Sequence, residues 1–176
     1  MKNENFSILV VDDEEEIRRF LRVSLRANQL DAALSRLAEA KKMLVYVSAD
    51  AEVQYVAARG IPCTGIEPTA STAAAARTRG IPIVEDFFGV RLAKELAAQG
   101  RQADLMAANN VLAHVPDIND FAAGFAHLLK PQGVATFEFP HLMRLVAENQ
   151  FDTIYHEHFS YLSLGTVSRI FAGAGL

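Results

Sequence analysis

Side chains able to transfer protons are concentrated in the last third of the chain. His141 is followed by the run Tyr155-His156-Glu157-His158, so three of the five histidines lie close together in the sequence. Histidine is the side chain that exchanges protons most readily near neutral pH, and a neighbouring carboxylate can orient its ring. The pattern predicts a general acid–base site in this segment.

Two other interpretations fit the same residues. In an extended segment, His156 and His158 would lie on one face and could bind a metal ion together with His141. Histidine and tyrosine also serve as partly buried hydrogen-bonding residues in polar loops that do no chemistry. The residue types alone leave the three alternatives open.

Polar residues also follow other segments that read as buried strands. Glu67 ends one of them, and a carboxylate in that position commonly accepts hydrogen bonds from the ribose hydroxyls of a nucleotide. Asn109, Asn110 and His114 leave a later strand through a short polar stretch that ends at a proline turn. This stretch is typical of a pocket lining, but also of an ordinary surface loop.

Asp12 and Asp13 follow the first apolar run and could hold Mg²⁺ through oxygen ligands. Residues 6–27 resemble the opening strand and helix of a response-regulator receiver domain, in which an acid pair binds Mg²⁺ beside a phosphoacceptor aspartate. No later predicted strand ends in a matching aspartate, and Lys130 precedes a strand instead of following one. The alternative interpretation is an acidic first turn that complements a helix dipole.

These residues need a framework of alternating strands and helices to position them. The predicted strands cover residues 7–11, 44–48, 63–67, 81–84, 105–108 and 134–139. The predicted helices cover residues 17–26, 30–42, 51–59, 70–79, 89–99 and 118–129. Short strands alternating with helices indicate a three-layer, doubly wound α/β fold with a mostly parallel, Rossmann-like sheet of about six strands. Four glycines near helix ends are expected in left-handed caps: Gly60, Gly80, Gly100 and Gly133.

Composition narrows the class of protein. The chain has 176 residues, 51% hydrophobic and 22% charged, which indicates one compact domain. Its net charge of −4 offers no basic surface for nucleic acid or anionic lipid. The lone Cys63 excludes an internal disulfide framework, and no apolar run is long enough for a membrane span. We expect a cytoplasmic protein, with the oligomeric state left open.

Five ordered segments from residue 54 onward carry a second resemblance. They read QYVAARGIPCTGIEPTASTAAAAR, IPIVEDFFG, ADLMAANNVLAHVPDINDF, LLKPQGVATFEFPHL and FDTIYHEHFSYLS. Together they resemble the methyl-transfer domain of S-adenosylmethionine-dependent C-methyltransferases that act on keto-deoxysugar nucleotides. The resemblance implies that Glu67 binds the adenosyl ribose and that Asp86 and Phe87 flank the adenine. It also implies that three residues lie near the methionyl end: Asn109, Asn110 and His114.

The resemblance also implies a reaction. A base removes the proton on the carbon next to a ketone, and the resulting enolate attacks the methyl group of the sulfonium. The family pattern places His158 as the base, with Tyr155 and Glu157 supporting the base or the enolate oxygen and His156 close by. In the Rossmann-like order, the strand at 44–48 is central, and the first strand either extends an edge or displaces it.

Three departures from the family pattern modify this expectation. Residues 45–53 contain no glycine where the family has a glycine-containing loop that lets the cofactor approach, although Asp50 could replace a lost acid. The family's zinc module and C-terminal domain are missing, and the chain ends inside an expected helix. We therefore expect a composite of a receiver-like start (1–28), a bridge (29–53) and a truncated methyltransferase-like body (54–176), with impaired activity or as an inactive chimeric scaffold.

Overall fold

The computed structural model describes residues 8–12, 43–47, 53–58 and 60–176. Six strands form one sheet in the order β1-β6-β5-β2-β3-β4, and every neighbouring pair is parallel. The strands are β1 (Ile8–Asp12), β2 (Leu44–Val47), β3 (Cys63–Ile66), β4 (Ile83–Val84), β5 (Ala103–Asn109) and β6 (Leu129–Phe139). The predicted α/β class is confirmed, and the helices predicted before residue 43 lie outside the described residues.

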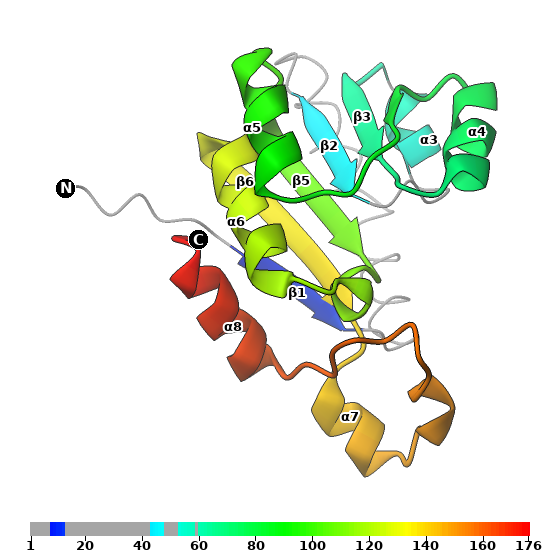
Figure 1. The fold of residues 1–176 in the computed structure, drawn as a ribbon, viewed down its shortest axis with the longest axis vertical. Coiled ribbons are helices and arrows are strands. Elements are labelled where there is room, and N and C mark those ends of the chain that lie inside the picture. The colour runs from blue at the N-terminus through cyan, green and yellow to red at the C-terminus, as the bar shows by residue number, and fades with distance from the viewer. Residues whose placement is uncertain (1–7, 13–42, 48–52, 59) are drawn as a thin grey trace, which may run out of the picture.

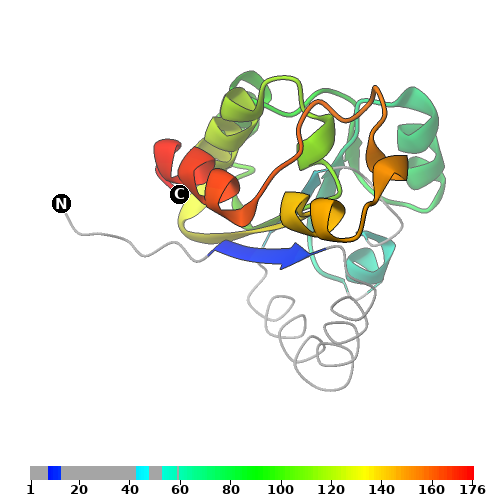
Figure 2. The same cartoon turned by 90° about the horizontal axis from the view of Figure 1, so that it is seen from below.

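The connecting segments are helical. They are α3 (Val53–Ala57), α4 (Ala70–Thr78), α5 (Val90–Ala98), η2 (Leu112–His114), α6 (Ile118–Leu128), α7 (Leu142–Ala147), η3 (Phe151–Thr153) and α8 (Leu164–Gly173). Figure 1 shows α5, α6 and α8 in front of the sheet, and Figure 2 shows α3 on the opposite side. No helix in the described ranges has the length and apolar character of a membrane-spanning segment.

Alternating side chains in the strands produce two apolar layers. Leu44 and Ala107 pack with α3 and α4, whereas Val45 and Met106 pack with α5, α6 and α8. Successive side chains of a strand point to opposite faces, so a sheet covered on both faces needs apolar residues at nearly every position. This requirement explains why the strand segments read as continuous apolar runs and why the architecture has three layers.

The strand order places β2 in the sheet as the Rossmann-like order predicts, with β3 on one side and β5 on the other. The first strand extends the edge beside β6, with Ile8 opposite Ala135 and Asp12 opposite Phe139. The alternative in which it displaces the strand at residues 44–48 is therefore wrong.

The start of β6 differs from the sequence prediction. The strand begins at Leu129 instead of residue 134, so Lys130 and Pro131 lie within it, and its pairing with β5 shifts register between Ala103 and Leu105. Such an irregularity accommodates a proline, which lacks the N–H that a regular ladder uses. Gly133 also lies in this strand and does not have a positive φ, so it is not a left-handed cap. A Cβ there would meet the Leu129 side chain and the Ala103 carbonyl.

The other three glycine predictions are confirmed. Gly60, Gly80 and Gly100 have φ angles of 69°, 76° and 73°, and each follows a helix. Only glycine takes this left-handed conformation without a steric cost from Cβ. These turns bring the chain back to the amino ends of β3, β4 and β5, so the polar residues that follow the strands gather at the opposite edge.

Candidate functional site

The polar residues predicted from the sequence follow the carboxyl ends of adjacent parallel strands. Glu67 comes directly after β3, Asp86 follows β4, and Asn109 is the last residue of β5. The arrowheads of β1, β2 and β5 point toward the end of the sheet where α7 and η3 lie (Figure 1). In open parallel sheets this edge is where ligands bind. The structure therefore brings these candidate residues to one edge.

Glu67 is the one charged residue that the described part of the chain buries, with 6% of its surface exposed. Its Oε1 accepts a hydrogen bond from the Thr69 backbone N–H at 2.8 Å, and its own N–H donates to the Val84 carbonyl at 3.0 Å. Buried carboxylates are uncommon unless they have partners. One of these bonds orients the carboxylate, and the other holds the Glu67 backbone beside β4.

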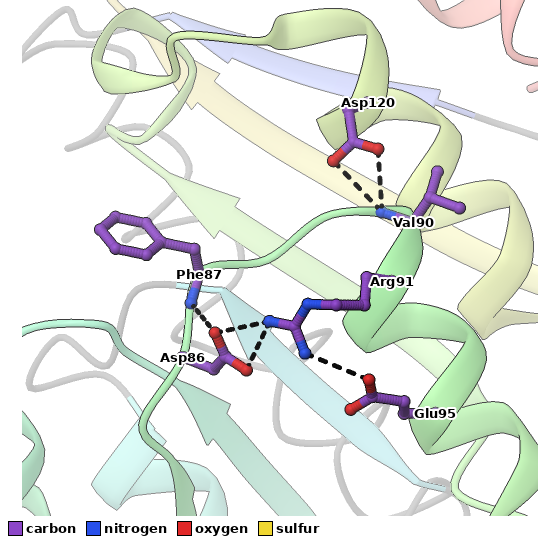
Figure 3. A network of polar contacts seen from close by, with 6 residues as sticks. All are labelled: Asp86, Phe87, Val90, Arg91, Glu95 and Asp120. Carbon is purple, nitrogen blue, oxygen red and sulfur yellow. Dashed lines mark hydrogen bonds and ion pairs between the residues drawn. The ribbon is translucent and has the colours of Figure 1, made fainter.

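Asp86 and Phe87 lie in the loop between β4 and α5 (Figure 3). The Asp86 carboxylate accepts from the Phe87 N–H at 2.8 Å and from Arg91 Nη2 at 2.8 and 2.7 Å. Hydrogen bonding to Arg91 lowers the pKa of Asp86, so the carboxylate stays ionised at lower pH than an isolated aspartate. The Phe87 ring is 76% exposed and presents an apolar face beside this carboxylate.

This loop is held against the start of α6. The Asp120 carboxylate accepts from the Val90 N–H at 3.3 and 3.4 Å (Figure 3), while its own N–H donates to Asp117 Oδ1 at 3.0 Å. A Cβ on Gly89 would collide with Asp120 Oδ2, and a Cβ on Gly124 would lie 3.0 Å from the Gly89 carbonyl carbon. Two glycines therefore permit the close approach that positions Asp86 and Phe87.

We expect Gly89→Ala to lower the free energy of unfolding by about 1–3 kcal/mol, because the added Cβ must displace Asp120 and break its bond to Val90. Urea denaturation measures the change. The control is Gly165→Ala in α8, where nothing lies within 4 Å of the added Cβ and the helix gains up to about 1 kcal/mol. Equal effects of the two variants would contradict a steric origin.

Residues 140–163 form a long connection between β6 and α8, which we call the His loop. Its two ends are joined by a parallel bridge between His141 and Leu162 and by a hydrogen bond from the Leu142 N–H to the Leu162 carbonyl at 2.8 Å. The Leu164 N–H also donates to His141 Nε2 at 3.1 Å. His141 therefore closes the base of the loop.

The far part of the His loop is attached to η2, which follows β5. The Ala113 carbonyl accepts from the Phe159 N–H at 2.7 Å and from the Ser160 N–H at 3.3 Å. His114 Nδ1 lies 3.1 Å from the Glu157 carbonyl. Asn110, at φ 52°, makes the turn that leads into η2, and its N–H donates to the Glu138 carbonyl. The loop thus connects to the ends of both β5 and β6.

His158 has an asymmetric environment. Its Nδ1 lies 2.8 Å from the Thr153 carbonyl, which can only accept, so Nδ1 carries the proton and Nε2 of the neutral ring has a lone pair. Nε2 is buried and has no hydrogen-bond partner among the residues that the structure describes. Three rings surround the imidazole, with centroids at 4.1 Å (Tyr155), 4.6 Å (His114) and 5.9 Å (Tyr161). An oriented imidazole with a basic nitrogen suits proton abstraction.

The other candidates in this segment lie apart from that ring. The side chain of His156 is 92% exposed, and its Nε2 is 4.0 Å from Glu157 Oε1. Glu157 reaches the cluster through its backbone carbonyl. Within the described ranges no three His, Cys, Asp or Glu side chains are grouped to hold a metal ion, so His141, His156 and His158 are not brought together as ligands.

Sequence reasoning did not identify four residues that position the site. Arg91 and Asp120 hold the loop that carries Asp86, while the Thr153 carbonyl and the Tyr161 ring contact His158. The i, i+5 spacing of Asp86 and Arg91, at the start of a predicted helix, was a usable signal. The Thr153 contact is made by a backbone carbonyl, which every residue has, so no residue type in the sequence could reveal it.

The fold is shared with known enzymes. A SAM dependent methyltransferase from Archaeoglobus fulgidus superposes with a TM-score of 0.65 at 13% identity, covering 90% of this chain and 73% of that one. An S-adenosylmethionine dependent methyltransferase from Mesorhizobium loti gives 0.58 at 13% identity, over 86% and 82%. The plantazolicin methyltransferase BpumL in complex with SAH gives 0.57 at 10%, over 90% and 69%. The architecture is that of this class of enzymes.

Residues 26–176 match the model of the methyltransferase domain family, and the chain belongs to that family. The C-methyltransferase NovU from Streptomyces niveus is 38% identical over 112 residues, which are 64% of this chain and 27% of the relative. The chain thus spans about a quarter of that relative's length.

These matches support the methyltransferase resemblance and not the receiver-like one. The family match begins at residue 26, ahead of residue 54 where the matching segments start. The receiver-like interpretation of residues 6–27 and its Mg²⁺ gain no support from the matches. Asp12 ends the edge strand β1, while Asp13, Asp50 and residues 48–52 of the glycine-free segment lie outside the described residues.

Proposed function

We propose that this chain is the catalytic domain of an S-adenosylmethionine-dependent C-methyltransferase, with His158 as the base that deprotonates a keto-deoxysugar nucleotide. The observation that carries the proposal is the buried His158 Nε2, which has no hydrogen-bond partner in the described ranges while Nδ1 faces the Thr153 carbonyl. Membership in the methyltransferase family and the name of the relative NovU support methylation at carbon.

The residues at the carboxyl edge of the sheet have the chemistry that the cofactor requires. Glu67 supplies an anionic acceptor suited to ribose hydroxyls, and Asp86 supplies one suited to the adenine amine. Phe87 offers an exposed ring on which the adenine can pack, and Asn109 and Asn110 supply amides toward the methionyl end. His114, at the end of η2, follows these amides in the chain, and its ring centroid lies 4.6 Å from that of His158.

Methylation at carbon requires a carbanion equivalent. When bound, S-adenosylmethionine supplies an electrophilic methyl group. His158 Nε2 accepts the proton from the carbon next to the substrate ketone, and the electron pair of that C–H bond moves into the enolate. The Thr153 carbonyl stabilises the imidazolium that forms, because Nδ1–H donates to it throughout. The Tyr155 ring neighbours the imidazole at a centroid distance of 4.1 Å, so once substrate is bound its hydroxyl is near enough to approach the enolate oxygen.

The test of proton abstraction does not require methyl transfer. The protein is incubated in D₂O with a nucleotide-linked keto-deoxysugar and S-adenosylhomocysteine, and deuterium next to the ketone is followed by NMR. Enzyme-dependent exchange supports the proposal. Titration calorimetry with S-adenosylhomocysteine tests the cofactor site separately, and no heat at high micromolar protein would remove S-adenosylmethionine from the proposal.

We expect Glu67→Gln to raise the dissociation constant of S-adenosylhomocysteine about 10- to 100-fold, because a charge-assisted hydrogen bond contributes roughly 1.5–3 kcal/mol. The amide oxygen of glutamine can still accept from Thr69, so the loop is retained. The matched control is Glu85→Gln, which removes an exposed ion pair with Arg77 and should leave affinity unchanged. If Glu67→Gln binds S-adenosylhomocysteine with unchanged affinity, Glu67 does not contact the ribose.

A further inference from the structure

His158 Nε2, the basic nitrogen of the proposed base, is buried although the neighbouring residues of the His loop are exposed. Tyr155, His156, Glu157 and Phe159 are all exposed residues of the His loop. His158 Nε2, in the middle of them, is buried and has no hydrogen-bond partner in the described part of the chain. A substrate cannot reach this atom unless something moves. The contacts around the ring show which group can move most easily.

The three neighbouring rings differ in how they are held. His114 is fixed through Nδ1 to the Glu157 carbonyl, and the Tyr161 hydroxyl donates to the Thr153 carbonyl at 3.4 Å. Among the described residues, no hydrogen bond holds the Tyr155 hydroxyl, and 43% of the residue is exposed. Tyr155 is also the closest of the three, at 4.1 Å with an interplanar angle of 34°. The Tyr155 ring is tilted over the imidazole, whereas the other two rings meet it edge-on at 62° and 81°.

We propose that the Tyr155 ring is a cover over His158 Nε2, which the substrate must displace to reach the base. Tyr155 then acts as a specificity-determining residue, because a substrate has to occupy the place of the ring against the imidazole before proton transfer. The consequence for catalysis rests on the proposed function. The enclosure of Nε2 by Tyr155 does not, so the two are tested independently.

The cover also explains how His158 Nε2 is kept available to accept a proton. Water next to Nε2 would donate a hydrogen bond and would have to be removed before the nitrogen could accept a proton from carbon. An apolar ring face excludes that water and forms no hydrogen bond of its own. Opening by rotation of the Tyr155 side chain would leave its backbone in place, where the Tyr155 carbonyl accepts from the His158 N–H at 3.1 Å.

Diethyl pyrocarbonate reports on this enclosure because it acylates an accessible, unprotonated imidazole nitrogen and releases ethanol and carbon dioxide. Fragment-ion mass spectrometry distinguishes His158 from the highly exposed His156 in the same peptide. In the unmodified sequence we expect His158 to react at least about tenfold more slowly than His156, since reaction of a buried atom requires local opening. Equal rates would overturn the proposal.

Two variants identify the covering group. Tyr155→Ala should bring the rate at His158 to within about threefold of that at His156, because opening is no longer needed. Tyr155→Phe keeps the ring and should preserve the slow rate. If Tyr155→Ala leaves His158 protected, or if His114→Ala exposes it and Tyr155→Ala does not, another ring is the cover and the proposal fails.

A structural readout separates opening from unfolding. Long-range ¹H–¹⁵N NMR on His158 reports the Nδ1–H tautomer, which requires the Thr153 carbonyl to stay in place. Tyr155→Ala should keep this tautomer while acylation accelerates. If the Tyr155→Ala variant loses the tautomer, the acylation rate is measured in Tyr155→Leu instead. A His158 acylation rate in Tyr155→Leu equal to that of the unmodified sequence would contradict a specific role of the aromatic ring. Acylation needs neither substrate nor cofactor. Slow acylation of His158 can therefore be observed even if the protein fails the deuterium-exchange test of the proposed function.

Discussion

His158→Gln should reduce methyl transfer and deuterium exchange by about 10²- to 10⁴-fold, the usual contribution of a general base. Glutamine retains a donor for the Thr153 carbonyl but has no nitrogen lone pair that can accept a proton. The affinity for S-adenosylhomocysteine should stay within about twofold, because hydrogen-bond partners of the cofactor are unchanged. Rates come from mass spectrometry of the product and affinity from calorimetry.

The matched control for this variant is His127→Gln, at an exposed position in the last turn of α6. It removes an imidazole far from the His loop in sequence and should alter neither rate nor affinity. If His158→Gln keeps full deuterium exchange, another group abstracts the proton. The first candidate would then be His114, whose ring lies 4.6 Å from that of His158.

Phe125→Ala should lower the free energy of unfolding by about 3–5 kcal/mol, as expected for deleting a buried aromatic side chain. Phe125 is fully buried in α6 and makes ring contacts with four other phenylalanines. They come from the loop before α5 (Phe88), from α6 (Phe121), from β6 (Phe137) and from α8 (Phe171). One substitution therefore loosens the sheet and the helices on one of its faces together. Urea denaturation followed by circular dichroism measures the change.

Phe87→Ala is the informative comparison because its ring is 76% exposed. We expect its free energy of unfolding to stay within about 0.5 kcal/mol of the unmodified value. Under the proposed function it should weaken binding of S-adenosylhomocysteine, so the variants at Phe125 and Phe87 separate stability from cofactor binding. A small effect of Phe125→Ala would contradict the shared aromatic core.

Much of the fold could be predicted because the sheet is covered on both faces. Buried strands such as Cys63–Ile66 have to be apolar throughout, and the glycines at 60, 80 and 100 mark the turns before them. The start of β6 could not be predicted, because Pro131 and Gly133 are normally signals of a break. Here a register shift and close packing on β5 override those local preferences.

For the candidate site, the residue types indicated which chemistry is possible, but they did not indicate which groups contact one another. The sequence indicated Glu67, which directly follows β3, and His158, whose loop is attached to η2 after β5. It could not show that the partner of His158 Nδ1 is the Thr153 carbonyl instead of the Glu157 carboxylate. Which neighbour turns toward an imidazole depends on η3 and on the attachment to η2, and neither short helix has a periodic pattern in the sequence.

The attachment of the His loop at both ends has an entropic consequence. Its base is tied between β6 and α8 and its far part is tied to η2, so the conformational freedom of the segment is lost when the chain folds and not when a substrate arrives. Under the proposed function, substrate binding then has to order little more than the Tyr155 rotamer. A base that is preorganised in this way would spend little binding free energy on its own arrangement, which would leave more for recognising the substrate.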